Sequence, residues 1–382
     1  MHRDPIYLDH NATTPLRPEV VGAMLPYLRE HHGNPSSTHV FGRRAHDAVE
    51  RARGQLAGLL GCDADELIFT SGGTESNNLA IRGATEARPG RRGVVTSVIE
   101  HAATERPCEW LARHGRSVSR VGVDADGRVR VDELVAACDA TTALVTVMHS
   151  NNETGVLQPI EEIAAAAHAC GAVVHTDAAQ SVGKVPVDVR TLGVDLLSVA
   201  GHKLYAPKGV GALYVRRGTL LLPFVLGAGH ERGLRPGTEN VASIVGLGVA
   251  AEIAARELLS AADRMRRLRD ELWESLSAAV PGLLLNGHAS LRLPNTLNVR
   301  FPGASGTAIL DGAPEVAAST VSACHAGGER PSAVIVAMGV PPEAAVGSVR
   351  LSLGYGTTRD QIAVASAALA ATWRRLLAER AG

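Results

Sequence analysis

The sequence predicts an α/β fold in which helices flank a mostly parallel sheet, followed by a smaller α+β unit. Two observations predict it. Through the first two thirds of the 382 residues, short runs rich in β-branched residues alternate with helical patterns, an order that favours a parallel sheet. The strand-like runs also lack a clean polar face, as expected when helices cover both sides of the sheet.

The elements follow in order along the first part of the chain. Seven segments are predicted to be strands: 66–70, 93–98, 117–123, 143–149, 172–178, 194–200 and 211–217. Helical patterns lie between several of them, at 48–60, 74–87, 101–114 and 159–169. Gly171 follows the last of these helices, where a glycine commonly ends a helix.

The pattern changes after a long helical stretch at 239–276, which could link two domains. Beyond it we predict a strand at 295–301, a helix at 331–339, a strand at 349–353 and a closing helix from about 358 to 380. We therefore expect a large α/β domain of residues 16–255. Residues 1–15 together with 256–382 would form a small α+β domain.

The composition narrows the class of protein. Apolar residues make up 45% and charged residues 20% of the chain, as in ordinary globular proteins. A net charge of −1 provides no electrostatic attraction for nucleic acid or an anionic membrane, so we expect neither as a partner. No apolar run has the roughly 20 residues of a membrane helix, and the first residues resemble no secretory signal. The cytoplasm is the expected location.

The cysteines and histidines predict neither disulfides nor a metal site. The five cysteines are an odd number, widely spaced and without a CxxC pair. Several histidines lie near one another between residues 31 and 46, but no HExxH or cysteine-containing spacing accompanies them. We expect solvated histidines on helix faces and, for most of the cysteines, small half-buried side chains.

The lysines are distributed in an unusual way. Among 38 lysines and arginines, only Lys184, Lys203 and Lys208 are lysines, and they fall close together. Arginine can replace lysine as a surface cation, but its guanidinium does not deprotonate and cannot form a Schiff base. The cluster therefore hints at a lysine with a chemical role.

Polar residues follow four of the predicted strands, at the edge of a parallel sheet where ligands bind. Gly73 and Thr74 begin a helix after 66–70, and a helix N-terminus suits a phosphate. The other strand ends carry Asn151 and Asn152, Asp177 and Gln180, and His202 and Lys203. A phosphate seat, an acid for a pyridine nitrogen and a lysine together predict pyridoxal 5′-phosphate as the cofactor.

Eleven motifs run nearly end to end along the chain: YLDHNATTP (7–15), GNPSSTH (33–39), FTSGGTESNN (69–78), IEH (99–101), NNETG (151–155), DAAQSVGK (177–184), GHKLYAPKGVGALYVRR (201–217), RPGTEN (235–240), LPNTLNV (293–299), SACHAG (322–327) and VRLSLG (349–354). Through these motifs the chain resembles the cysteine desulfurases of the class-V aminotransferase group, which are fold-type I pyridoxal-phosphate enzymes, in the nitrogen-fixation and iron–sulfur-assembly branch.

The resemblance implies roles for these residues. Lys203 would carry the cofactor and move the α-proton of the substrate, Asp177 would pair with the pyridine nitrogen, and His101 would stack on the ring and take part in proton transfer. The remaining cofactor contacts would be Gly73, Thr74 and His202 at the phosphate, Gln180 at the ring hydroxyl, and Asn152. Thr238 would reach the phosphate of the neighbouring subunit, which implies a homodimer with shared active sites.

The resemblance also implies a substrate and a nucleophile. Asn152 and Arg350 would hold L-cysteine, the guanidinium forking onto the substrate carboxylate. Cys324 would accept the sulfur as a persulfide, leaving L-alanine, and pass it to an acceptor protein for iron–sulfur clusters, thio-cofactors or tRNA. The residues around Cys324 are small, polar and glycine-rich, and their seven-residue spacing to Pro331 is that of the long-loop branch.

The sequence departs from the family pattern at several places, and two rival functions stay open. Ala200 stands where the family usually has a serine before the cofactor lysine, Ala206 replaces a usual glycine, and Tyr355 replaces a frequent arginine. The sequence of residues 304–325 also differs from the commonest family sequence. Because Ala200 has no hydroxyl, one hydrogen bond to the phosphate should be missing.

A selenocysteine lyase shares much of the motif sequence, and a binding protein could keep the fold without the chemistry.

Overall fold

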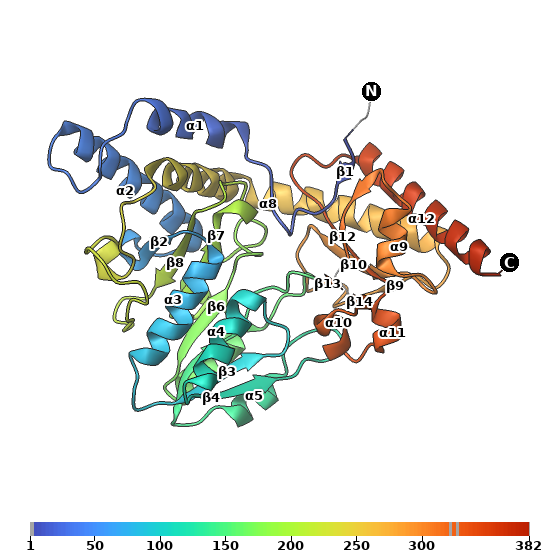
Figure 1. The fold of residues 1–382 in the computed structure, drawn as a ribbon, viewed down its shortest axis with the longest axis horizontal. Helices are drawn as coiled ribbons and strands as arrows, with labels where there is room; N and C mark the ends of the chain where they lie inside the picture. Colours follow the sequence, from blue (N-terminus) through green and yellow to red (C-terminus); the bar gives the residue numbers. More distant parts are fainter. Residues whose placement is uncertain (1–3, 321–322, 326–327, 382) are drawn as a thin grey trace.

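The computed structural model describes residues 4–320, 323–325 and 328–381, with the backbone alone at 323–325, 328–329 and 381. Figure 1 shows a larger part built around one sheet and a smaller part that carries both chain termini, with helix α8 (Val241–Ala279) running through both. The fold class predicted from the sequence is confirmed.

A seven-stranded sheet in the order β2-β8-β7-β6-β5-β3-β4 forms the centre of the larger part. The strands are β2 (Leu67–Thr70), β3 (Gly93–Ser97), β4 (Ser117–Val121), β5 (Thr142–Thr146), β6 (Val173–Asp177), β7 (Leu196–Ala200) and β8 (Gly211–Val215). Each matches a predicted strand. Only β8 is antiparallel to its neighbours, because the short connection from β7 contains no crossover helix to return the chain.

Helices cover both faces of this sheet. They are α1 (Pro18–Arg29), α2 (Val40–Leu60), α3 (Gly73–Glu86), α4 (Ala102–Arg113), α5 (Val131–Ala137), α6 (Ile160–Ala169) and α7 (Val189–Leu192), with short 3₁₀ turns η1 (Ala64–Glu66), η2 (Gly201–Lys203) and η3 (Glu231–Gly233). In β5, Leu144 packs with residues of α3 and α4, whereas Val145 packs with residues of α2, α6 and α8. Adjacent strand residues therefore enter opposite halves of the core, which explains the missing polar face.

The smaller part contains an antiparallel sheet in the order β12-β15-β10-β9. Its strands are β9 (Leu284–Leu285), β10 (Thr296–Arg300), β12 (Ser319–Thr320) and β15 (Ser348–Ser352); β1 (Ile6–Tyr7) pairs with β11 (Val316–Ala317), and β13 (Ala323–His325) forms a hairpin with β14 (Gly328–Arg330). The helices are α9 (Gly306–Asp311), α10 (Ala333–Ala337), α11 (Pro342–Ala345) and α12 (Arg359–Ala381).

Two separate hydrophobic cores share α8. Ala250, Ala251 and Ile253 belong to the core of the large sheet, and Leu268, Leu272 and Leu276 belong to that of the small part. Leu8, near the N-terminus, also lies in the second core. The core to which α8 contributes changes between Ile253 and Leu268.

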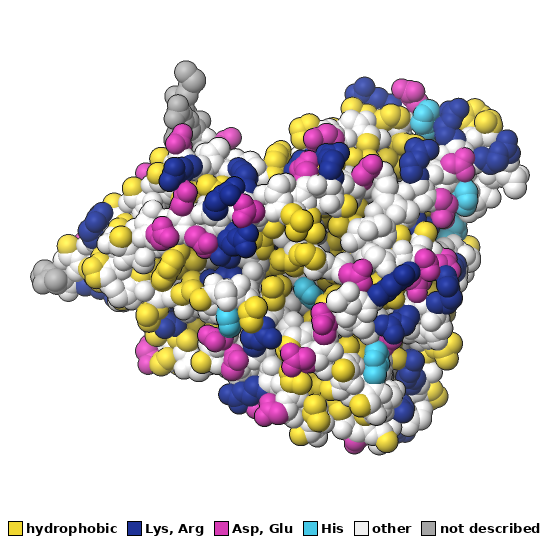
Figure 2. All heavy atoms as spheres, turned by 180° about the vertical axis from the view of Figure 1, so that it is seen from behind, with side chains coloured by type: hydrophobic (Ala, Val, Ile, Leu, Met, Phe, Trp, Pro, Cys, Tyr) yellow, Lys and Arg dark blue, Asp and Glu magenta, His cyan; other side chains and the backbone are white. Residues whose placement is uncertain are grey.

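The surface carries both signs of charge. On the face shown in Figure 2, basic and acidic side chains alternate without an extended area of one sign. None of the helices in the described part of the chain is long and apolar enough to span a bilayer.

Candidate active site

A cavity opens beyond the carboxyl ends of β5, β6 and β7, next to the first turn of α3. Its lining residues are Gly73, Thr74, His101, Ala103, Met148, Ser150, Asn152, Asp177, Ala179, Gln180, Ala200, His202 and Lys203. Eight of the residues predicted to bind the cofactor therefore share one cavity: Gly73, Thr74, His101, Asn152, Asp177, Gln180, His202 and Lys203. Parallel strands end at the same edge of the sheet, which is why positions so distant in sequence meet.

The first turn of α3 forms the floor of one end of this cavity. Gly72 precedes the helix with φ 147°, a backbone conformation that favours glycine. At Gly73 a Cβ atom would stand 3.3 Å from the Cβ of Ala200, so the glycine lets the helix end approach β7. The unpaired N–H groups of the first turn suit an anion. Ala200 lines this region without a hydroxyl, as the sequence suggests.

Asp177 ends β6, and both of its carboxylate oxygens accept hydrogen bonds. Asn77 Nδ2 donates to Oδ2 at 2.7 Å, and the Ala179 backbone N–H donates to Oδ1 at 2.9 Å. Asn77 lies one helical turn after Gly73 in α3 and is fully buried. Each carboxylate oxygen keeps a further lone pair, so Asp177 can accept a proton donor from a ligand while its orientation stays fixed.

Lys203 ends the 3₁₀ turn η2 that follows β7. Burial lowers the pKa of its ammonium to about 8, with Asp177 opposing and Arg350 adding to this effect. Among the residues that the structure describes, its Nζ has no hydrogen-bond or ion-pair partner. The amine is therefore free to react and is partly deprotonated near neutral pH.

His101 precedes α4 and caps it. Its Nδ1 accepts a hydrogen bond from the Ala103 backbone N–H at 3.1 Å, so a neutral ring must carry its proton on Nε2. Burial lowers the pKa of the imidazole, against the effect of Asp177. The ring is thus kept neutral and in one tautomer at the mouth of the cavity.

Gln180 and His202 link the cavity to the N-terminal segment. Gln180 Nε2 donates to the Asn11 carbonyl at 2.9 Å, and Lys184 Nζ donates to Gln180 Oε1 at 3.1 Å. His202 Nδ1 lies 3.1 Å from Thr13 Oγ1. Burial, reinforced by Lys203, lowers the pKa of His202 to about 4, so this ring is neutral.

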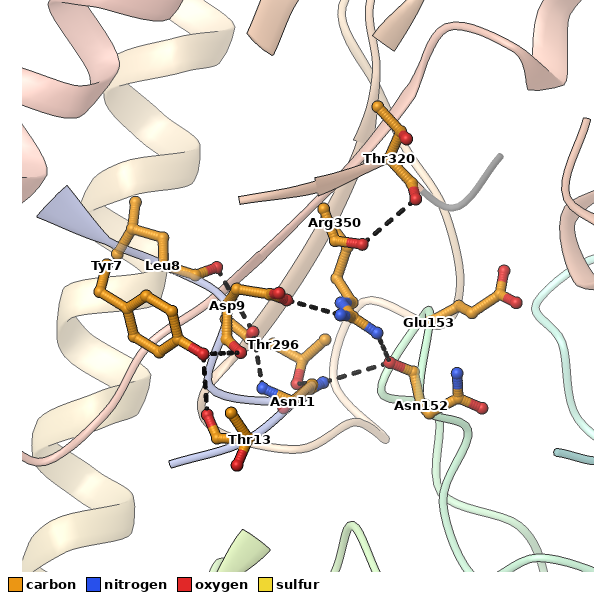
Figure 3. Close-up of polar contacts among 12 residues, drawn as sticks. Tyr7, Leu8, Asp9, Asn11, Thr13, Asn152, Glu153, Thr296, Thr320 and Arg350 are labelled. Carbon is orange, nitrogen blue, oxygen red and sulfur yellow. Dashed lines mark hydrogen bonds and ion pairs between the residues drawn. The ribbon is translucent and has the colours of Figure 1, made fainter. Parts of the chain in front are cut away.

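Arg350 lies next to this cavity without lining it. Arg350 belongs to β15 of the small part, and its side chain extends toward Asn152 of the large part (Figure 3). Nη1 donates to the Asn152 carbonyl at 2.9 Å, and Nη2 is 2.6 Å from Asp9 Oδ1. The pairing with Asn152 uses that residue's backbone carbonyl, so within the described part of the chain Arg350 does not occupy the Asn152 side-chain amide, and Asn152 lines the cavity.

Thr238 does not line this cavity, and the structure does not test the placement of the Cys324 thiol. Thr238 lies exposed in the loop before α8, away from the cavity lining. The backbone of Cys324 lies in the β13–β14 hairpin opposite Glu329, but its side chain lies outside the described residues.

The sequence did not indicate the residues that form hydrogen bonds or ion pairs with the predicted site residues. Asn77 could have been found, because it lies four residues after Gly73 and therefore on the same helix face. Asp9 and Asn11 belong to the YLDHNATTP motif, but nothing in the motif indicates which strand they contact.

Residues 6–364 match the family described as Aminotransferase class-V. The chain belongs to the class-V aminotransferases. Membership of this family and the relatives below imply pyridoxal 5′-phosphate as the cofactor, and the predicted family is confirmed.

The relatives of this class-V aminotransferase include several cysteine desulfurases. A cysteine desulfurase of Trichormus azollae is 47% identical over 359 residues, covering 94% of this chain and 90% of the relative. Cysteine desulfurase NifS of Azotobacter vinelandii is 47% identical over 360 residues with the same coverage. Cysteine desulfurase IscS of Dictyoglomus turgidum is 45% identical over 363 residues, covering 94% and 91%.

Solved structures share the fold of this class-V aminotransferase. A "NifS-like protein" superposes with a TM-score of 0.90 at 36% identity, covering 97% of this chain and 99% of the other. DndA from Streptomyces lividans gives a TM-score of 0.77 at 40% identity, covering 91% and 99%.

Proposed function

We propose that this protein is a pyridoxal-phosphate-dependent cysteine desulfurase that takes sulfur from L-cysteine, leaves L-alanine and hands the sulfur from Cys324 to an acceptor protein. One observation carries the proposal: the amine of Lys203 has no partner within the described residues and shares a cavity with Asp177, His101 and the α3 N-terminus. The cysteine desulfurases among the relatives support the same activity.

The residues around the cavity fit the cofactor. The close approach of Gly73 to Ala200 leaves a cradle of backbone N–H groups that a side chain would fill, and this cradle suits a phosphate. Asp177, held by Asn77, offers a negative charge for a protonated pyridine nitrogen. Lys203 offers the amine for covalent attachment. When bound, pyridoxal phosphate would take up the electrons released when the substrate loses its α-proton.

The chain's own residues would bind the substrate and move its protons. Arg350 would bind the substrate carboxylate through N–H groups that neither Asp9 nor Asn152 uses. Lys203, whose pKa is lowered to about 8, would take the α-proton as a neutral amine. The neutral His101, with its proton on Nε2, would serve as a donor at the mouth of the cavity.

Sulfur transfer requires a thiolate. Cys324 Sγ would attack the substrate sulfur, so that a sulfur–sulfur bond forms while the carbon–sulfur bond breaks. The carbon then gains a proton, which gives L-alanine and a persulfide on Cys324, and no outside oxidant is needed. Burial raises the pKa of Cys62, Cys108 and Cys138 to about 12, which makes these three thiols poor nucleophiles.

We further propose a homodimer in which Thr238 serves the neighbouring active site, and a domain boundary near residue 255. The exposure of Thr238 and its distance from this chain's own cavity lining support the first part. The change of core along α8 supports the second.

The function is tested on the purified protein with its cofactor. We expect L-alanine and, with a thiol reductant, sulfide from L-cysteine, and we expect neither from Lys203→Arg because arginine cannot attach the cofactor. Borohydride reduction and peptide mapping should find the cofactor on Lys203. Attachment to Lys184 or Lys208 would contradict the assignment.

The nucleophile is tested with Cys324→Ser. This variant should bind cofactor and L-cysteine but release no sulfide, and radiolabelled sulfur should appear on Cys324 only in the unmodified protein. Label on Cys62, Cys108, Cys138 or Cys170 would show that another thiol reacts. Turnover of selenocysteine, but not cysteine, by both proteins would point to a selenocysteine lyase.

A further inference from the structure

Arg350 is held by one carboxylate from the N-terminal segment. Its side chain is 8% exposed, and Nη2 lies 2.6 Å from Asp9 Oδ1, the only ion pair that the described residues give it. Arg350 and Asp9 are 341 positions apart in the sequence. A buried guanidinium needs such a counter-charge, because an unpaired charge is costly to bury.

The backbone of Asp9 is fixed to the same strand that carries Arg350. Asp9 forms a parallel bridge with Ser352, two residues along β15. The bonds on either side are Ser352 N–H to the Leu8 carbonyl at 2.7 Å and His10 N–H to the Ser352 carbonyl at 3.2 Å. Residues two apart on a strand share a face, so Asp9 meets Arg350 without any loop adjustment.

The surrounding segment is fixed as well (Figure 3). Tyr7 Oη donates to the carbonyls of Asp9 at 3.1 Å and Thr13 at 3.0 Å. Asn11 Nδ2 donates to Thr296 Oγ1 at 2.9 Å and to the Asn152 carbonyl at 3.3 Å, the same carbonyl that Arg350 Nη1 contacts. The N-terminal segment therefore connects the small part to the strand-end loop of the large part at Arg350.

The contacts made by the described residues leave part of the guanidinium without a partner. Of its five N–H groups, Asp9 and the Asn152 carbonyl each bind one. Nε is buried and, within the described part of the chain, has no partner. Asp9 and the Asn152 carbonyl hold different nitrogens, so together they fix the plane of the guanidinium, and Asp9 does not bind it in a bidentate manner.

We propose that Asp9 is a positioning residue that holds Arg350 with its remaining N–H groups ready for a substrate carboxylate. It thereby sets how strongly the site prefers an α-amino acid to the same compound without a free carboxylate. The inference rests on the proposed role of Arg350 in substrate binding, and it gives a function to the YLDHNATTP motif.

The test compares L-cysteine with L-cysteine amide, which differ only in the charge of the group that Arg350 would bind. For Asp9→Asn we expect the KM for L-cysteine to rise about tenfold with kcat within about twofold, because binding must now order a loosened guanidinium. The KM for the amide should stay unchanged. Spectral titration with L-alanine and alaninamide should give the same difference in affinity without turnover.

A double-mutant cycle separates positioning from a merely structural effect. Arg350→Met should abolish the preference for the acid, and adding Asp9→Asn in that background should change the preference no further. Asp9→Glu, which keeps the charge, should retain most of the preference. Glu257→Gln is the matched control, since Glu257 pairs with Arg17 at the same 2.6 Å outside the site; it should leave the preference unchanged.

Several outcomes would overturn the inference. A lower KM for L-cysteine in Asp9→Asn would mean that Asp9 competes with the substrate. Equal changes for acid and amide, or an effect that persists without Arg350, would mean a structural role only. Failure of the proposed function is distinguishable, because the unmodified protein would then turn over no cysteine.

Discussion

At the scale of single residues, the candidate site depends on how Lys203 and Asp177 are held. Asp177 accepts two hydrogen bonds and has little freedom to reorient, whereas the Lys203 amine has no partner in the described ranges. A fixed acid beside a free amine suits a site that receives its ligand in one orientation. The chemistry of both residues then depends on pH in a way that can be measured.

Cofactor capture should follow the protonation of Lys203. Only the neutral amine reacts, and its pKa is lowered from 10.5 to about 8 by burial. In cofactor-free protein, the rate of attachment of pyridoxal phosphate should therefore rise with pH and level off above about 8. Stopped-flow absorbance between pH 6.5 and 10 measures this. A rate still rising between pH 9 and 10 would mean an ordinary lysine, and Lys203→Arg provides the baseline.

Ala200 gives a second prediction at this scale. It lines the cavity near Gly73, where a serine hydroxyl could donate to the phosphate. Ala200→Ser should bind pyridoxal phosphate roughly fivefold more tightly, as expected for about 1 kcal/mol from one added hydrogen bond. Fluorescence titration of the cofactor-free protein measures the affinity. Ala206→Gly, a nearby departure from the family pattern that lies outside the cavity lining, should leave this affinity unchanged. A similar gain in affinity in both variants would argue against a phosphate contact.

At the scale of elements, one contact joins the loop after β5 to the helix that follows the Cys324 hairpin. Ser332 begins α10, and its hydroxyl donates to the Glu153 carboxylate. The Glu153 carbonyl also accepts from Asn298 Nδ2 of β10 at 3.0 Å. Glu153 therefore connects the loop that carries Asn152 to the start of α10, directly after the hairpin, and to β10.

Glu153 should make stability depend on pH. Burial raises its pKa from 4.5 to about 7, although the hydrogen bond from Ser332 and the charge of Arg350 oppose the shift. The folded protein then binds this proton more tightly than the unfolded chain, so the Glu153 contribution to the free energy of unfolding falls as pH rises from about 4.5 to about 7. Glu153→Gln cannot titrate, and its stability relative to the unmodified protein should be higher at pH 8 than at pH 5.

Denaturant unfolding of both proteins at the two pH values measures this difference. Subtracting the free energy of unfolding of the unmodified protein from that of Glu153→Gln at each pH removes the contribution of Glu100, which both proteins share. Burial raises the pKa of Glu100 to about 8. Ser332→Ala is the companion variant: it removes the hydroxyl donor and leaves the carboxyl able to titrate. A relative stability of Glu153→Gln that is the same at both pH values would contradict the raised pKa.

At the scale of the whole molecule, two strongly exposed leucines precede Thr238 in the sequence. Leu226 is 85% exposed and Leu220 is 66% exposed, both in the loop before Thr238. A large apolar side chain this exposed is a candidate for burial in an interface. We therefore test these leucines as part of the proposed homodimer contact.

We expect sedimentation to give about twice the 39.8 kDa mass of one chain. Leu226→Asp should shift this equilibrium toward the monomer, since a carboxylate would have to be desolvated in the interface. Leu259→Asp is the control, because Leu259 is 76% exposed but lies on α8. A chain that sediments at the mass of a monomer would contradict the dimer.

The sequence could predict the fold because most strands of the large sheet are short runs rich in β-branched residues and four of them are followed by polar residues. Those regularities are local, and they brought eight site residues to one cavity. The antiparallel direction of β8 follows from the short connection after β7. The pairing of Asp9 with Arg350 depends on a contact 341 positions apart in the sequence, so no local pattern indicates it. The two-residue strands of the small part were likewise too short to show a period.

Helix α8 is continuous over 39 residues, roughly 60 Å at the usual rise, and each end is embedded in a different core. The rotation of the small part about the helix axis, relative to the large sheet, is therefore set by the number of residues in α8. One residue inserted between Arg256 and Arg264 would turn everything beyond it by about 100° relative to the large sheet. Arg350 would then swing away from the Asn152 carbonyl, even though no side chain of the site had changed. Substitutions along the exposed middle of α8 should be tolerated, whereas a single insertion or deletion there should be as damaging as losing Arg350 itself.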